Sequence, residues 1–367
     1  MLAALEGVLE GRDAPLVPVP PSQSGLLTTA LRVGEEIDDG IALVVTTSGT
    51  TGTPKGAMLT AAALIASATA THDRLGGPGC WLLALPPYHI AGVQVLVRSV
   101  LAGVGPVELD VSAGFDTNEL PSAVAKLGSG RRYASLVAAQ LAKALTDDAA
   151  TSALADLDAV LIGGGPAPRP VLDGAAAAGI PVVRTYGMSE TAGGCVYDGV
   201  PLDGVRVRIG PEGRITIGGA PLAKEYRNPP VPSPFDETGW FRTDDVGAID
   251  DSGVLRVLGR ADEAISTGGL TVLPQPVEAV LSAHPAVTDC AVFGVADDRL
   301  GQRVVAAVVP TDSAAPPNLE QLRTHVTSAL DATAAPRELY IVHALPRRGI
   351  GKVDRKTLVQ RFGTEAR

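Results

Sequence analysis

The chain contains few of the residues that hold small disulfide-bonded or zinc-bound domains together. Only three of its 367 residues are cysteines, Cys80, Cys195 and Cys290, and they lie far apart with no C-x-x-C spacing. Neither a disulfide framework nor a cysteine-ligated zinc site is therefore expected. Aromatic residues make up 4% of the chain and hydrophobic residues 46%, so a large core must consist mostly of alanine, valine and leucine.

The chain also lacks an excess of basic residues and long apolar runs. Its 30 lysines and arginines face 40 aspartates and glutamates, and the formal net charge of −10 argues against nucleic-acid partners. No uninterrupted apolar run reaches the roughly 18 residues that span a bilayer. The first residues contain glutamates and no basic region of the kind that begins a signal peptide. We therefore expect a cytoplasmic protein with no stable membrane insertion.

Between residues 41 and 186, apolar segments of strand length alternate with helix-compatible segments. Strands are predicted at 41–47, 80–85, 105–109, 133–137, 159–163 and 181–185. Helices are predicted at 60–73, 92–102, 117–127, 138–146 and 169–178. Buried strands that alternate with helices are typical of an α/β fold with mostly parallel sheets.

The pattern changes after residue 202. Short segments separated by glycine turns between 202 and 258 predict a small barrel-like β appendage. Beyond it we predict a strand or loop at 264–273, strands at 289–295, 303–309 and 338–342, and helices at 276–283 and 318–330. The predicted fold class is therefore α/β, with a large N-terminal domain at 1–259 and a small α+β C-terminal domain at 260–367.

Residues 46–56 read TTSGTTGTPKG and follow the apolar run at 41–45. Small residues let backbone N–H groups approach an anion, hydroxyls add donors, and Lys55 adds positive charge, so the segment predicts a polyphosphate cradle. It is not a Walker A loop, because Pro54 stands where the second glycine is needed. Likewise Gly163-Gly164-Gly165 is not a dinucleotide fingerprint, because Pro168 replaces its last glycine, and plain turn glycines remain an alternative there.

Four segments in order resemble the acyl-adenylate-forming superfamily, which includes acyl- and aryl-CoA ligases, peptide-synthetase adenylation domains and luciferases. They are residues 46–56, 186–191 (YGMSET), 239–245 (GWFRTDD) and 351–352 (GK). The resemblance implies a reaction in two halves, in which a carboxylate attacks the α-phosphate of ATP and a thiol then displaces AMP from the acyl-AMP. It also implies Mg²⁺ as cofactor and ATP and CoA as co-substrates.

The same resemblance implies roles for individual residues around the nucleotide. The β- and γ-phosphates would be held by Thr47, Ser48, Gly49, Thr50, Thr51, Gly52 and Lys55. The adenine and α-phosphate would be met by Gly163, Gly164, Gly165, Tyr186, Gly187, Met188 and Ser189. Within the second group Tyr186 would stack on the adenine and Ser189 would donate to the α-phosphate. Glu190 would bind Mg²⁺, although it could instead simply begin a helix, where its charge suits the dipole.

Further matches lie near the domain boundary and the C-terminus. Asp244 matches the aspartate that accepts from both ribose hydroxyls, whereas Asp245 is interpreted as a solvated or structural carboxylate. Arg260 would lie near the ribose and α-phosphate, and Asp262 would be the hinge about which a mobile C-terminal domain turns. Lys352 would stabilise charge on the incoming carboxylate and the α-phosphate. The other basic residues between 347 and 356 could instead form a solvated surface with no role in catalysis.

Residues 86–92 and 131–140 look like those of the o-succinylbenzoate–CoA ligases of menaquinone biosynthesis. That acid has a second carboxylate, which needs a donor or a cation because burying it unpaired is costly. The candidates are His89, Arg98, Arg131, Arg132 and Ser135. His89 could equally be a packing residue, and of the adjacent arginines at most one should point inward. Gly268 and Gly269 are candidates for the pantetheine arm of CoA by analogy alone.

Alternative functions remain open at this point. The chain could be another aryl- or acyl-CoA ligase, a carrier-loading enzyme, or a degenerate nucleotide-binding scaffold. Its phosphate loop begins as early as residue 46, whereas the superfamily usually has far more sequence before it. Apolar surface left by the shorter start could be covered by a partner, so a homodimer is expected.

Overall fold

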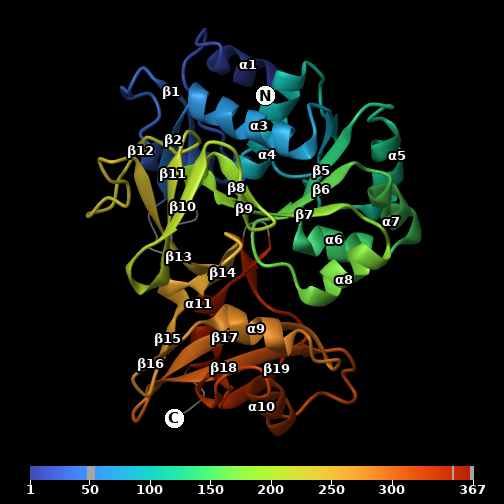
Figure 1. The fold of residues 1–367 in the computed structure, drawn as a ribbon, viewed down its shortest axis with the longest axis vertical. Coiled ribbons are helices and arrows are strands. Elements are labelled where there is room, and N and C mark those ends of the chain that lie inside the picture. Colours follow the sequence, from blue (N-terminus) through green and yellow to red (C-terminus); the bar gives the residue numbers. More distant parts are fainter. Residues whose placement is uncertain (48–53, 349–350, 364–367) are drawn as a thin grey trace.

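The structure is a computed structural model that describes residues 1–47, 54–348 and 351–363. Figure 1 shows a larger part, made of the chain up to the end of the β appendage, and a smaller part below it made of the remaining residues. Among the described residues, no helix combines the length and the apolar character needed to cross a membrane.

A seven-stranded sheet forms the centre of the larger part. In spatial order it contains β4 (Val107–Glu108), β3 (Cys80–Leu83), β5 (Arg132–Val137), β6 (Ala159–Gly163), β7 (Val182–Met188), β8 (Gly193–Tyr197) and β9 (Val200–Pro201). The strands from β4 to β7 are parallel, and β8 and β9 continue the sheet in antiparallel pairing. The predicted, mostly parallel core is thus confirmed.

Helices cover both faces of this sheet. One face carries α1 (Leu2–Leu9), α3 (Ala61–Leu75) and α4 (Ile90–Ala102), whereas the other carries α5 (Leu120–Ala125), α6 (Ala138–Ala144), α7 (Asp148–Ala155) and α8 (Arg169–Ala177). Successive strand residues divide between the two cores: Trp81 and Tyr133 pack with the first set, Leu82 and Ala134 with the second. This double burial explains the uninterrupted apolar strands.

The segment after the predicted phosphate loop differs from the prediction. Residues expected to lead directly into a helix form β2 (Lys55–Thr60), which pairs antiparallel with β1 (Ile41–Thr47), so the loop joins the two strands of a hairpin. On its other side β2 pairs with β12 (Glu225–Tyr226). The prediction missed β2, which lies between the neighbouring β1 and a second partner about 170 residues away that local sequence does not reveal.

The predicted β appendage is a four-stranded antiparallel sheet. It contains β10 (Val205–Ile209), β11 (Arg214–Gly219), β13 (Trp240–Ile249) and β14 (Leu255–Arg260). Its buried residues Ile215, Ile217 and Leu255 pack against Cys195 and Val196 of β8, so the appendage is joined to the central sheet. Figure 1 shows it beside the carboxyl ends of the parallel strands.

The smaller part has its own sheet and cores. Its strands are β15 (Ile265–Thr267), β16 (Leu270–Val272), β17 (Val287–Asp297), β18 (Gly301–Pro310) and β19 (Glu338–Ile341). Its helices are α9 (Pro274–Leu281), α10 (Leu319–Thr327) and α11 (Arg355–Phe362). One core joins the sheet to α9 and α10, and a second joins its other face to α11. A short hairpin of β20 (Arg347–Arg348) and β21 (Lys352–Val353) precedes α11.

Candidate active site

The carboxyl ends of the parallel strands gather most of the predicted site segments. The chain leaves β6 at Gly163, and β7 runs directly into the short 3-10 helix η3 (Ser189–Thr191). His89 caps the start of α4 after β3. In open α/β sheets this edge is where ligands bind. The arrangement places the predicted adenine, α-phosphate and acid segments beside one another.

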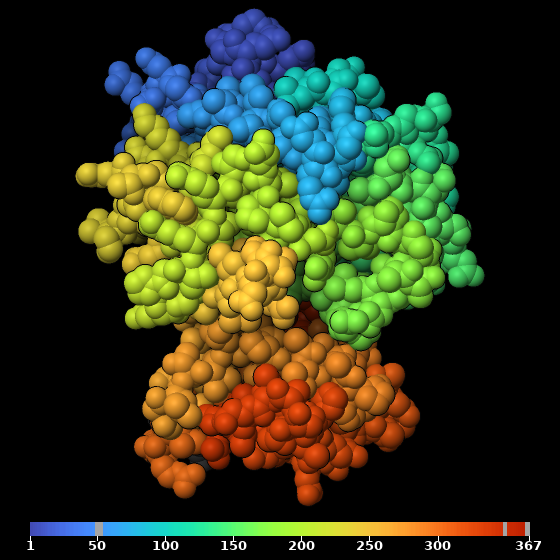
Figure 2. Space-filling model, in the orientation of Figure 1, coloured from blue at the N-terminus to red at the C-terminus, as the bar shows by residue number. Residues whose placement is uncertain are grey.

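Lys352 reaches this edge from the smaller part. It begins β21. Burial raises the pKa values of Glu190 and Asp245, and the positive charge of Lys352 acts against that rise. Burial followed by the same charge lowers the pKa of His89. The neighbouring Gly351 lies against Ala139 at the start of α6. Figure 2 shows the surface hollowed between the two parts, with dark red atoms from the end of the chain inside the hollow. The predicted catalytic lysine therefore faces the cleft.

Glu190 is a buried carboxylate between two lysines. Burial raises its pKa, while the Tyr226 hydroxyl, Lys352 and Lys55 act in the opposite direction. The Tyr226 hydroxyl donates to its Oε1 at 2.5 Å. Glu190 does lie in a short helix, but as one 3-10 turn rather than at the start of a longer helix. A buried carboxylate that faces two cations is better suited to bind a metal ion than to cap a helix.

Ser189 joins two of the predicted motifs. Its Oγ donates to the carbonyl of Thr46 at 3.4 Å, so the segment after β7 contacts the strand that leads into the phosphate loop. Thr47 and Lys55 lie opposite each other at the ends of β1 and β2. The predicted phosphate ligands Ser48, Gly49, Thr50, Thr51 and Gly52 lie outside the described residues.

The two adjacent aspartates of β13 have different environments. Asp245 is buried, accepts from the Tyr186 hydroxyl at 2.7 Å and lies 3.5 Å from Arg260. The positive charge of Lys352 also favours its ionised form. Burial raises the pKa of Asp245, against the effects of these three partners. The side chain of Asp244 is 57% exposed and pairs with Arg214 at 2.9 Å. Asp245 therefore faces the cleft, which excludes the solvated carboxylate of the sequence interpretation but not the structural one.

A sequence signal for this difference was present and was missed. Along β13 the buried residues alternate, and Phe241, Thr243 and Asp245 share one face. Asp244 lies on the other face with Arg242. The apolar Phe241 marks the inward face, and counting in steps of two from it reaches Asp245.

Arg260, at the end of β14, contacts the carboxylate of the predicted hinge residue Asp262 and carboxylates of β13. It forms a fork with Asp262 through two 2.8 Å hydrogen bonds, and it also lies within 3.6 Å of Asp244. Burial alone would lower the pKa of the guanidinium, but Asp262, Asp245 and Asp244 together raise it. The residue remains fully charged beside the cleft.

Of the acid candidates, His89 and Ser135 lie toward the cleft. His89 packs its ring against Tyr88 with 4.9 Å between centroids, and burial followed by Lys352 lowers its pKa. Ser135 is buried on the same face of β5 as Tyr133. Arg98 is buried two turns further along α4, where its guanidinium lies 4.4 Å from the Trp81 ring centroid.

The candidates Arg131 and Arg132 are a correction to the sequence prediction. They lie at the amino end of β5, opposite to the edge that carries Lys352 and Glu190. Arg132 forms an exposed ion pair with Asp156 at 2.8 Å, and Arg131 packs beside Gly76. Both arginines were chosen for their charge, but strand direction places that charge at the wrong end of the sheet.

The glycine candidates have structural explanations. A side chain at Gly163 would collide with Thr185 Oγ1 at 2.5 Å, and Gly164 has a φ of 82°. Gly268 and Gly269 form the two-residue turn between β15 and β16, both with positive φ, as such hairpins require. Roles with adenine and CoA therefore stay predictions at these positions.

The donor set suits a metal ion that arrives with phosphates. Within the described ranges no group of three or more histidines, cysteines and carboxylates could hold a metal ion. Mg²⁺ that bridges phosphates keeps several waters and needs only one or two protein carboxylates. The buried Glu190 supplies one such carboxylate.

Comparison with known families settles the relationship. The family model for AMP-binding enzymes matches residues 14–226, and the model for the C-terminal domain of AMP-binding enzymes matches residues 276–352. The chain belongs to the AMP-binding enzyme family.

Relatives within this family are similar over much of the chain. A probable 2-succinylbenzoate–CoA ligase of Mycobacterium tuberculosis strain H37Rv is 75% identical over 100% of this chain and 96% of its own length. A 2-succinylbenzoate–CoA ligase of Geobacillus sp. strain WCH70 is 34% identical over 88% of this chain and 69% of its own. The chain is thus shorter than the Geobacillus relative but similar in length to the mycobacterial one.

Solved structures of the family share this fold. The o-succinylbenzoate CoA synthetase of Bacillus subtilis, in complex with the acyl-adenylate OSB-AMP, has a TM-score of 0.75 and 29% identity over 87% of this chain and 69% of its own. ATP-bound MatB from Rhodopseudomonas palustris has a TM-score of 0.80 and 27% identity over 91% of this chain and 70% of its own. The predicted superfamily, enzyme class and fold class are therefore confirmed.

Proposed function

We propose that this AMP-binding enzyme is an ATP-dependent acid–CoA ligase that converts 2-succinylbenzoate, CoA and ATP to 2-succinylbenzoyl-CoA, AMP and diphosphate. The acid is suggested by the 75% identity to the mycobacterial ligase along the whole chain. The two-step reaction is supported by one observation above all: Lys352 of the smaller part faces Glu190 and Asp245 of the larger part.

In the first half-reaction, a carboxylate oxygen of the acid bonds to the α-phosphorus of ATP as the bond to diphosphate breaks. Lys352 stabilises negative charge on both reacting groups, and the Ser189 hydroxyl turns from the Thr46 carbonyl to donate to the α-phosphate. Thr47 and Lys55 hold the leaving diphosphate. Mg²⁺ held by Glu190 neutralises phosphate charge when bound.

The nucleoside is held on the other side of the cleft. We assign the ribose hydroxyls to Asp245 rather than to Asp244, because Asp245 is buried beside Lys352 while Asp244 faces solvent. An ionised carboxylate only accepts hydrogen bonds, which suits a diol. The Tyr186 hydroxyl holds Asp245 in place, and Arg260 adds positive charge near the α-phosphate.

The unreacted carboxylate of the acid is assigned to the start of α4. His89 has a lowered pKa and is neutral at pH 7, so it contributes a hydrogen bond rather than a charge. The N-terminus of α4 contributes partial positive charge from its free N–H groups. Ser135 adds a hydroxyl from β5.

In the second half-reaction the CoA thiol attacks the acyl carbon and AMP leaves. We assign residues 1–259 and 260–367 to two domains, with Asp262 as the hinge about which the smaller one reorients. The boundary falls one residue before the end of β14, immediately before the fork between Arg260 and Asp262. Gly268 and Gly269 remain candidates for contact with the pantetheine arm after this rotation.

The deciding experiment measures acid-dependent ATP–pyrophosphate exchange and thioester formation across a panel of aryl and alkyl acids with CoA. We expect 2-succinylbenzoate to give the highest kcat/KM in both assays. A higher kcat/KM with another acid would make that acid the assigned substrate. Thioester formation on a carrier protein but not on CoA would indicate a carrier-loading enzyme. No exchange with any acid would indicate a nucleotide-binding scaffold.

A further inference from the structure

Asn228 holds the backbone on both sides of Lys55. Its Nδ2 donates to the carbonyl of Pro54 at 2.6 Å, and its Oδ1 accepts from the N–H of Gly56 at 3.2 Å. The asparagine amide offers a separate donor and acceptor on adjacent atoms, as two such bonds require. The backbone N–H of Arg227 also donates to the carbonyl of Gly56 at 2.7 Å. Lys55 is thus anchored by one side chain that lies more than 170 residues further along the chain.

Tyr226, two residues earlier, contacts both charged groups at this end of the cleft. The Lys55 ammonium lies 5.3 Å from the centroid of its ring, and its hydroxyl donates to Glu190. Residues 226–228 therefore contact the predicted diphosphate ligand and the predicted Mg²⁺ ligand at the same time. The spacing between these ligands is set by the end of β12 and the bend that follows it.

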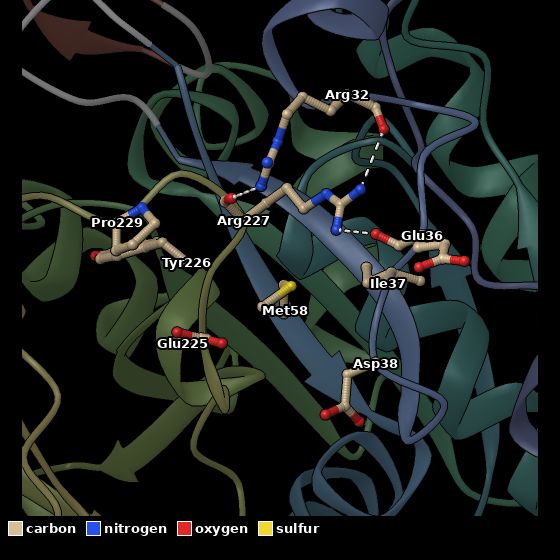
Figure 3. Close-up of a pocket in the computed structure, with 9 residues that line it drawn as sticks. All are labelled: Arg32, Glu36, Ile37, Asp38, Met58, Glu225, Tyr226, Arg227 and Pro229. Atoms are coloured by element: carbon tan, nitrogen blue, oxygen red, sulfur yellow. Dashed lines mark hydrogen bonds between the residues drawn. The ribbon is translucent and has the colours of Figure 1, made fainter.

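Arg227 fixes the position of this segment. Its buried guanidinium donates to the backbone carbonyls of Leu31, Arg32, Glu35 and Glu36. In return Arg32 donates to the Arg227 carbonyl at 2.5 Å, and Figure 3 shows the two side chains at a surface pocket. The Arg227 guanidinium is fully used in this contact, so Asn228 is the neighbouring side chain that bonds to the backbone on both sides of Lys55.

We propose that Asn228 is a positioning residue that orients Lys55 toward the leaving diphosphate. The inference rests on the proposed function, because it takes Lys55 as a diphosphate ligand. Lysine has a flexible four-carbon stem, so its ammonium is only as well placed as the backbone that carries it. Asn228 fixes the peptide groups before and after that stem. Its effect is confined to adenylation and its reversal, because thioester formation from acyl-AMP involves no diphosphate.

The test compares the two half-reactions in Asn228→Ala. The KM for pyrophosphate in the exchange assay should rise about tenfold, as expected for the loss of one to two hydrogen bonds. Thioester formation from supplied 2-succinylbenzoyl-AMP and CoA should stay within about twofold of wild type. In a Lys55→Ala background, Asn228→Ala should add less than about twofold, because a residue that acts through Lys55 has nothing left to position.

Two further variants separate positioning from general stability. Asn318→Ala removes the same amide from the N-cap of α10, where it accepts from the N–H of Gln321, so it should lower Tm and leave the KM for pyrophosphate unchanged. Asn228→Asp keeps the shape and the acceptor but loses the donor to Pro54. It should raise the KM for pyrophosphate at least as much as alanine does, and it provides the measurement if Asn228→Ala does not fold.

These measurements test the positioning role of Asn228 separately from the proposed function. Equal losses in both half-reactions, additivity with Lys55→Ala, or a wild-type KM for pyrophosphate in Asn228→Asp would each overturn the positioning role. A wild-type enzyme that shows no exchange with any acid would instead overturn the proposed function.

Discussion

The contrast between Asp244 and Asp245 gives the sharpest test of the nucleotide site. The two residues are adjacent and chemically identical, so the same change, aspartate to asparagine, can be made at each. Asp245→Asn keeps one acceptor oxygen for the Tyr186 hydroxyl, removes the charge that faces Arg260 and turns the other oxygen into an NH2 donor. Asp244→Asn removes an exposed partner of Arg214. Each variant is therefore the control for the other.

The expected magnitudes differ because the environments differ. Hydrogen bonds to a charged acceptor contribute about 1.5–3 kcal/mol, and two ribose hydroxyls share Asp245. Because the asparagine retains one acceptor oxygen, we expect a loss of about 2 kcal/mol, or about 30-fold in kcat/KM for ATP. Exposed ion pairs contribute at most about 1 kcal/mol, so Asp244→Asn should change kcat/KM by less than about fivefold.

The assay is acid-dependent ATP–pyrophosphate exchange as a function of ATP concentration, with AMP affinity measured by calorimetry. AMP carries the same ribose, so its affinity should fall in Asp245→Asn and persist in Asp244→Asn. A larger loss in Asp244→Asn than in Asp245→Asn would refute the reasoning from burial and restore the assignment made from the sequence.

Three other perturbations have defined outcomes. Lys352→Ala should reduce exchange by about 100-fold or more and spare thioester formation from supplied acyl-AMP, whereas equal loss of both would contradict its role. His89→Ala should raise the KM for 2-succinylbenzoate about tenfold and Arg132→Ala should leave it within about twofold; steady-state kinetics would contradict the assignment if the order were reversed. Burial lowers the pKa of His72 to about 4, so between pH 6.5 and 4 this histidine is protonated in the unfolded chain but not in the folded chain. The free energy of unfolding should therefore fall by up to about 3 kcal/mol between pH 6.5 and 4, and urea titrations of His72→Gln should lack this part of the slope.

Local sequence predicted the strands in which successive residues are all buried. The runs that form β3, β5 and β6 are apolar because helices cover both of their faces, and that pattern is visible without the fold. β2 was missed although it pairs with the neighbouring β1, and its second partner β12 lies far along the chain. Of the site residues predicted from motif order, Lys352, Glu190 and Tyr186 lie beside one cleft in the structure, and their roles stay predictions.

For the remaining candidate residues, the sequence does not show which way the side chain or the strand points. Asp245 could have been identified from the alternation along β13, whereas Arg131 and Arg132 could be rejected only once the parallel strands had a common direction. Tyr226 and Asn228 carry no local pattern that would connect them to Lys55. Their contacts exist because β12 pairs with β2, and this pairing is a property of the whole fold.

The pairing of β2 with β12 has a consequence for protein engineering. Residues 46–56 look like a self-contained motif in the sequence, but their last residues are held by Asn228 and their lysine lies over Tyr226. A graft of this loop into another scaffold would transfer the hydroxyls and the charge without the groups that orient them. The smallest transferable unit is a discontinuous one, which includes the two-strand hairpin and the distant segment around Tyr226.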